Sequence, residues 1–167
     1  MATGLLTAIA AFGLTAWLQP FGAIDDNVAT RGRMAVLSAL APALMLAVCI
    51  ARLAAHRFRT PQDLDGSGLT AGTETAKILQ ALLQNTLEQT VLAVPVYAAF
   101  SLFAPARLLA VTPLAALLFV LGRLLFFRGY RRGAGGRALG FALTFYPTLL
   151  LLVGAIGFAG AGARSIY

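Results

Sequence analysis

Five long stretches without a charged side chain dominate the chain. They cover residues 1–24, 34–51, 89–106, 108–122 and 138–163. A helix of about 20 residues crosses a hydrocarbon layer about 30 Å thick. Each stretch reaches that length when weakly polar residues at its ends are included, and the fourth also needs residues 123–127. The pattern therefore predicts an all-α membrane protein with five transmembrane helices.

The composition supports this prediction. Of the 167 residues, 59% are hydrophobic and only 11% are charged, which is far from the profile of an ordinary soluble domain. The net charge of +7 is also common in proteins that bind nucleic acid. Here, however, the arginines stand at the ends of apolar stretches rather than in a basic domain with interleaved aromatic residues. We therefore expect membrane lipids, and no nucleic acid, as partners.

Two clusters of arginines predict the orientation in the membrane. Cytoplasmic loops of membrane proteins are enriched in Arg and Lys, so both clusters are expected in the cytoplasm, in contact with anionic lipid. Five alternating crossings then place the N-terminus inside and the C-terminus outside. The clusters are Arg52, Arg57 and Arg59 in the first loop, and Arg128, Arg131, Arg132 and Arg137 in the second.

The first apolar stretch allows two interpretations. It could be a cleaved signal peptide, but residues 1–24 lack a basic start and show no convincing small-x-small cleavage site. A retained helix that ends near Gln19 and Pro20, with Trp17 at the membrane interface, is the favoured interpretation.

A row of polar side chains enters the third apolar stretch. At about 100° per residue its members fall on one side of a helix. Because such groups are costly in hydrocarbon, a functional site is sought here first, although Gln and Asn in membrane helices also serve simply to bond one helix to another. This row, called the polar seam below, consists of Lys77, Gln84, Glu88 and Pro95, with Ala81 among them and Asn85 beside them.

Glu88 needs a partner because a lone carboxylate in hydrocarbon is expensive unless it is paired or protonated. Counted from the ends of their helices, Glu88 and Arg123 lie at similar depths of roughly 6 to 7 Å. We therefore predict a partly buried ion pair between them, within one chain or between protomers. Arg123 also shares a helix face with Phe127 and Tyr130.

The loop after the second stretch matches part of a calcium-loop template. Against calcium, Pro61 breaks the entering helix and no second such loop exists to pair with it. A solvated Asp/Gly turn that feeds a helix start near Thr73 is favoured. The matching positions are Asp63, Asp65, Ser67, Gly68 and Glu74.

The chain has one cysteine and one histidine, so it has no internal disulfide and no rich His/Cys metal site. We expect Cys49 to be a packed, inert thiol and His56 to lie at the level of the lipid headgroups. Around the start of the last apolar stretch, Gly136 and Gly140 form a small-xxx-small pair that permits close approach of two helices.

Two segments together resemble the MAPEG superfamily, the membrane-associated proteins in eicosanoid and glutathione metabolism. They are LQNTLEQTVLAVP at 83–95 and GRLLFFRGYRRGAGGRALGFALTF at 122–145, and the resemblance extends over about residues 34–160. It implies a four-helix bundle over residues 33–167 that assembles as a homotrimer. Residues 1–32 would then be an extra N-terminal transmembrane helix and its connector. A bacterial-type member of this kind is expected in the bacterial inner membrane.

The resemblance also implies roles for single residues. Arg137 is similar to the arginine that polarises the thiol of glutathione, the co-substrate, which the family binds between protomers near the cytoplasmic side. Arg137 is therefore the candidate catalytic residue, and no metal is expected. The candidate glutathione-binding residues, some from the family motifs and some from the polar seam, are Lys77, Gln84, Asn85, Glu88, Arg123 and Tyr130.

Two positions depart from the glutathione-binding pattern. Ala81 stands where relatives carry an arginine, with Gln80 beside it, and Phe126 replaces a tyrosine. Lys77 is a candidate substitute for the lost arginine.

Two functions remain open. One is a membrane transferase or peroxidase that uses glutathione, or another small thiol, on hydrophobic electrophiles. The other is a non-catalytic structural or ligand-binding membrane protein.

Overall fold

The computed structural model describes residues 2–18, 25–66 and 69–164. These residues are almost entirely helical and include no strand. The long helices are α1 (Ala2–Leu18), α2 (Val28–Arg59), α3 (Glu74–Phe103), α4 (Val111–Gly129) and α5 (Gly133–Arg164), and short 3₁₀ turns occur at η2 (Pro61–Asp63), η3 (Ala106–Leu108) and η4 (Tyr130–Arg132).

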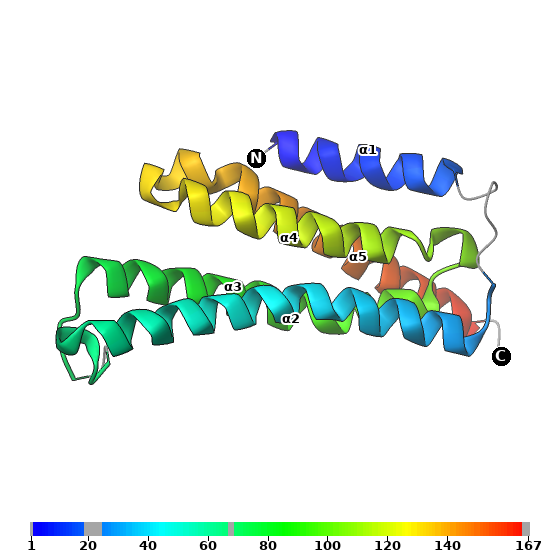
Figure 1. The fold of residues 1–167 in the computed structure, drawn as a ribbon. Helices are drawn as coiled ribbons and strands as arrows, with labels where there is room; N and C mark the ends of the chain where they lie inside the picture. Colours follow the sequence, from blue (N-terminus) through cyan, green and yellow to red (C-terminus); the bar gives the residue numbers. More distant parts are fainter. Residues whose placement is uncertain (1, 19–24, 67–68, 165–167) are drawn as a thin grey trace.

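The helices form two hairpins that pack on each other. Helix α2 pairs with α3, α4 pairs with α5, and α1 lies along the outside of the α4–α5 hairpin (Figure 1). The core lies between the hairpins and is built from large side chains such as Tyr97, Phe119 and Leu151, each at most 1% exposed. The prediction of an all-α protein is confirmed.

Three helical stretches are long and apolar enough to cross a membrane: Val28–Arg59, Glu74–Phe103 and Ala106–Ala161. The third contains α4 and most of α5, and these two helices fold back on each other at η4 (Figure 1). Helix α1 contributes a shorter apolar segment, Leu5–Thr15. The chain is therefore an integral membrane protein, as its composition predicted.

Helices α4 and α5 approach each other closely at glycines. A Cβ atom on Gly140 would lie 2.7 Å from the carbonyl oxygen of Gly122, and one on Gly122 would lie 2.5 Å from Thr144 Oγ1. A side chain at either position would force the helices apart. The close approach predicted for the pair Gly136 and Gly140 is confirmed.

Local signals in the sequence set the helix ends. Helix α3 begins after Thr73, whose hydroxyl accepts a hydrogen bond from Ala76 N at 3.2 Å, and the predicted start near this residue is confirmed. At its other end, the Arg31 guanidinium donates to the carbonyls of Ser101, Leu102 and Ala104. This contact ties α2 to the C-terminus of α3.

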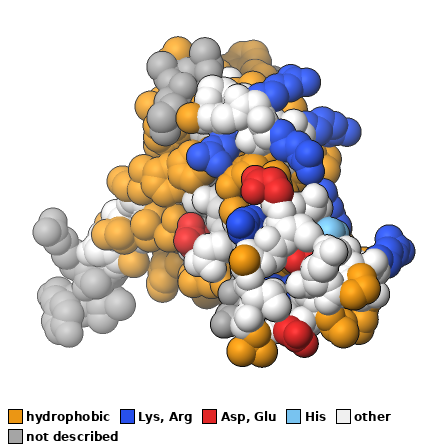
Figure 2. Space-filling model, turned by 90° about the vertical axis from the view of Figure 1, so that its left-hand side faces the viewer, with side chains coloured by type: hydrophobic (Ala, Val, Ile, Leu, Met, Phe, Trp, Pro, Cys, Tyr) orange, Lys and Arg blue, Asp and Glu red, His pale blue; other side chains and the backbone are white. Residues whose placement is uncertain are grey.

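Both arginine clusters lie at one end of the bundle. The α2–α3 loop and the η4 turn both lie at this end, whereas α5 runs to the opposite end (Figure 1). Figure 2 shows blue Lys and Arg side chains over this end face, with few red acidic ones among them. We refer to it as the basic end.

Candidate functional site

Arg123 is fully buried between the two hairpins, with 0% of its surface exposed. Its Nη1 donates to Asn85 Oδ1 at 2.8 Å, and its Nε and Nη2 both donate to Thr144 Oγ1 at 3.1 Å. Its Cζ also lies 4.5 Å from the centre of the Phe126 ring. An amide, a hydroxyl and an aromatic face therefore hold this cation.

The predicted ion pair between Glu88 and Arg123 is wrong within the chain. Glu88 is exposed, and its Oε1 accepts a hydrogen bond from Gln84 Nε2 at 3.0 Å. Glu88 follows Asn85 by three positions and is rotated about 60° from it around the helix. Asn85 faces the interior and meets Arg123, whereas Glu88 stays with the outward row. Glu88 and Arg123 lie at similar depths along their helices, but their side chains do not point toward each other.

The polar seam lies on the outer surface of the single chain. Its four members, Lys77, Gln84, Glu88 and Pro95, are all exposed. Their predicted position on one side of the helix agrees with the exposure that they share.

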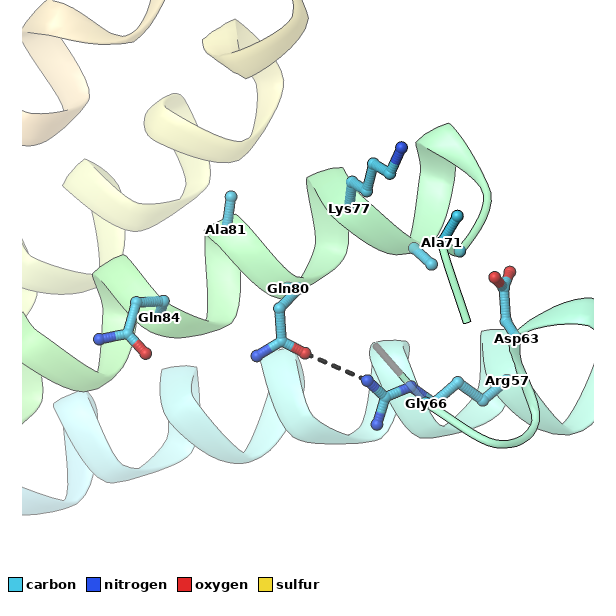
Figure 3. Close-up of a pocket in the computed structure, with 10 residues that line it drawn as sticks. Arg57, Asp63, Gly66, Ala71, Lys77, Gln80, Ala81 and Gln84 are labelled. Carbon is cyan, nitrogen blue, oxygen red and sulfur yellow. Dashed lines mark hydrogen bonds between the residues drawn. The ribbon is translucent and has the colours of Figure 1, made fainter. Parts of the chain in front are cut away.

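Lys77 and Gln84 line a cavity of about 390 Å³ at the basic end. It lies between the end of α2, the loop that follows it and the start of α3. Arg57 and Gln80 point toward each other inside it, and Arg57 Nη2 donates to Gln80 Oε1 at 3.2 Å (Figure 3). The sequence pattern identifies Arg57 only as a marker of the cytoplasmic side. No local pattern could have assigned it, because the contact joins residues 23 positions apart.

The loop beside this cavity is closed by the buried carboxylate of Asp63. Thr73 donates to it from its backbone N at 2.7 Å and from its hydroxyl at 2.6 Å, and His56 Nε2 lies 2.8 Å away. The Thr73 hydroxyl, its N–H and His56 together lower the pKa of Asp63 below 3.8. This carboxylate, the first position of the calcium template, already has protein donors.

Two other template positions, Ser67 and Gly68, lie outside the described residues. Among the described residues no group of three or more His, Cys, Asp or Glu side chains is arranged to hold a metal ion.

Arg137 lines a second cavity at the same end, of about 370 Å³, between α3, α4 and α5. Its guanidinium lies over the Tyr130 ring, with Cζ 4.7 Å from the ring centre. Asn85, Phe126 and Phe141 line the cavity as well. The structure thus brings Asn85, Arg123, Tyr130 and Arg137 into one region, and it places Lys77 and Gln84 in the other cavity and Glu88 on the outer surface.

Cys49 is buried at 3% exposure, and its Sγ donates to Thr86 Oγ1 at 3.4 Å. The prediction of a packed thiol is confirmed.

Comparison with known proteins agrees with this architecture. The model of the MAPEG family matches residues 32–157, which is more than half of the chain. No curated protein and no solved structure matches it. The matched region holds α3, α4, most of α2 and α5, both cavities and the buried Arg123, and it leaves α1 outside. This chain is therefore an integral membrane protein that belongs to the MAPEG family.

Proposed function

We propose that this protein is a membrane enzyme that binds glutathione, or another small thiol, and transfers it to a hydrophobic electrophile or uses it to reduce one. The observation that carries the proposal is the position of Arg137. Its guanidinium lines a cavity at the basic end, supported by the face of Tyr130 and next to Asn85, which Arg123 holds in place. A fixed cation beside a cavity is what a thiolate needs.

The first cavity supplies groups for the anionic parts of such a thiol. Arg57, Lys77 and the amides of Gln80 and Gln84 line it together with Asp63, whose carboxylate is already bonded to Thr73 and His56. Its volume falls within the ~300–1,000 Å³ typical of ligand pockets. Cationic and amide side chains of this kind donate hydrogen bonds to carboxylates. We propose that Arg57 and Lys77 take over the contact that is lost at Ala81.

The exposed polar seam supports assembly as a homotrimer. Lys77, Gln84 and Glu88 lie on an outward face of a membrane protein, where contact with lipid is unfavourable. Packing of α3 against a second copy would cover these side chains. It would also bring the cavity lined by Arg57 and Lys77 in one protomer close to the cavity lined by Arg137 in its neighbour.

The proposed topology has four bundle crossings and one by α1, in a bacterial inner membrane, with the N-terminus in the cytoplasm. The shared position of both arginine clusters at the basic end supports it.

A second candidate is a non-catalytic membrane protein. Phe126, which stands in place of a tyrosine, packs its ring on Arg123 and supports the bundle rather than offering a hydroxyl. In that case Arg123 and Asn85 would serve the fold alone.

The test compares wild type with Arg137→Ala. Free thiols near pKa 8.5 are only a few per cent ionised at neutral pH, and lowering that pKa by about two units raises the reactive fraction more than tenfold. We expect wild type to show thiolate absorbance with glutathione and turnover of a halogenated nitroarene, and Arg137→Ala to lose both at unchanged thermal stability. Arg131→Ala, a matched substitution of an exposed arginine, should retain both. If wild type gives neither signal with a series of thiols, the second candidate replaces the first.

A further inference from the structure

An apolar groove runs along α2 where this helix faces α4. It consists of two adjoining cavities of about 280 and 530 Å³ that share Ala41. Together they extend from Met34 to Ala47 on α2 and from Pro113 to Val120 on α4, and no charged side chain lines either one. The groove starts near the N-terminal end of α2, which is the end of the bundle opposite the basic end (Figure 1). It is therefore separate from the cavities of the proposed thiol site.

Ser38 is a buried polar side chain in the wall of this groove. It is 2% exposed and lines the smaller cavity. Among the described residues its Oγ is the one buried side-chain nitrogen or oxygen without a hydrogen-bond partner. In addition, Pro42, four residues later, has no N–H with which to bond the Ser38 carbonyl. A buried hydroxyl without a partner is costly and needs an explanation, and a ligand with an acceptor would supply one.

We propose that the groove binds one acyl chain of a membrane glycerophospholipid, with an ester carbonyl that accepts a hydrogen bond from Ser38 Oγ. The dimensions fit a lipid of the leaflet at the Arg33 end. Arg33 is the last charged residue before the apolar part of α2, and Ser38 follows it by about 7.5 Å along the axis at ~1.5 Å per residue. From Ser38 to Ala47 the groove runs a further ~13.5 Å, close to the ~15 Å of hydrocarbon in one leaflet.

Charge and surroundings agree with this occupant. The apolar stretch of α2 lies within a membrane-crossing segment, so the groove is open to molecules dissolved in the bilayer. Arg33 is exposed at the groove's polar end, where it can contact the phosphate of the headgroup. Acyl chain, ester and phosphate thus each meet a matching part of α2, in the order in which they occur in the lipid.

The experiment uses the full chain in bilayers that contain a phospholipid with a photoreactive diazirine on one acyl chain. After irradiation, labelled peptides are quantified by mass spectrometry. Labelling of the wild type should fall mainly within residues 34–47 and within residues 113–120. Ala41→Phe should fill the groove and remove most of this labelling, whereas Ala51→Phe, on the same helix and outside the groove, should leave it unchanged.

An ether-linked version of the same probe tests the hydrogen bond. Because it lacks the ester carbonyl, its labelling of wild type should fall by about two- to tenfold, the worth of one hydrogen bond. Ser38→Ala should label weakly with both probes and show no difference between them. Equal labelling of every exposed apolar face, or insensitivity to Ala41→Phe, overturns the proposal.

A second copy of the chain seated on the groove would also overturn it. This outcome is detected by disulfide trapping of Leu37→Cys in a Cys49→Ala background, which would join two copies. Thiol binding is not used as a readout, so failure here is separate from failure of the proposed enzyme activity.

Discussion

Among the described residues, two side chains that carry a charge at neutral pH are almost completely buried, and they lie in different parts of the molecule. Arg123 sits between the hairpins at 0% exposure, and Asp63 sits in the α2–α3 loop at 2% exposure. A threonine hydroxyl serves each of them. Thr144 Oγ1 accepts from the guanidinium, and Thr73 Oγ1 donates to the carboxylate. Because a hydroxyl both donates and accepts, the same residue type stabilises opposite charges.

The two sites differ in what surrounds the threonine. The described partners of Arg123 are neutral, namely Asn85, Thr144 and aromatic faces, and they belong to three different helices. Asp63 bonds to a backbone N–H and to His56 across a single loop. The difference indicates that Arg123 holds the two hairpins together, whereas Asp63 holds only its own loop. Loss of the first should affect the whole bundle, and loss of the second should stay local.

The largest effect is expected for Arg123→Leu. It leaves the Asn85 amide without its donor in the bundle interior, at a cost of about 3 kcal/mol or more in unfolding free energy. Unfolding in detergent should show that Arg123→Leu with Asn85→Leu costs less than the sum of the single changes, because neither partner is then left unpaired. Glu88→Gln is the matched control. Its effect should add to that of Arg123→Leu within about 0.5 kcal/mol, and strong coupling would instead reveal a Glu88–Arg123 pair between protomers.

An intermediate effect is expected for Thr144→Val. It keeps the shape of the side chain but removes the oxygen that accepts from Nε and Nη2 of Arg123, which should cost about 1.5 to 3 kcal/mol. Thr144→Ser keeps the oxygen and should recover most of the loss. Comparable destabilisation by both variants would show that packing of the methyl group, rather than the hydrogen bonds, is what matters at this position.

The smallest effect on the bundle is expected from acidification of Asp63. Because its folded-state pKa is lowered from 3.8, its contribution to loop stability is fully present above the unfolded-state pKa and is lost as pH falls below 3.8 and through the lower folded-state value. Hydrogen exchange at the Thr73 amide, which donates to Asp63 Oδ1, should speed up over this window while amides in the middle of α3 stay protected. Asp63→Asn should remove most of the pH dependence. Simultaneous loss of protection throughout α3 would mean that the loop is not an independent unit.

The sequence already contained much of this fold and part of the site. Apolar length predicted membrane helices, Thr73 marked a helix start, and the spacing of Gly136 and Gly140 predicted a close contact that the structure contains. The family motifs identified Asn85, Arg123 and Arg137, which do gather in one region. These features depend on length, local hydrogen bonding and the 3.6-residue period, all of which are read along one segment.

Which polar groups meet was decided only by the tertiary structure. Depth in the membrane made Glu88 and Arg123 equal candidates for pairing, but the rotation of α3 about its axis turned Asn85 inward and left Glu88 outside. The contacts from Arg57 to Gln80 and from Asp63 to Thr73 and His56 likewise depend on how the α2–α3 loop folds back. Side-chain partners across helices are fixed by the rotation and offset of whole elements, and these follow from packing of the entire bundle rather than from any single stretch of sequence.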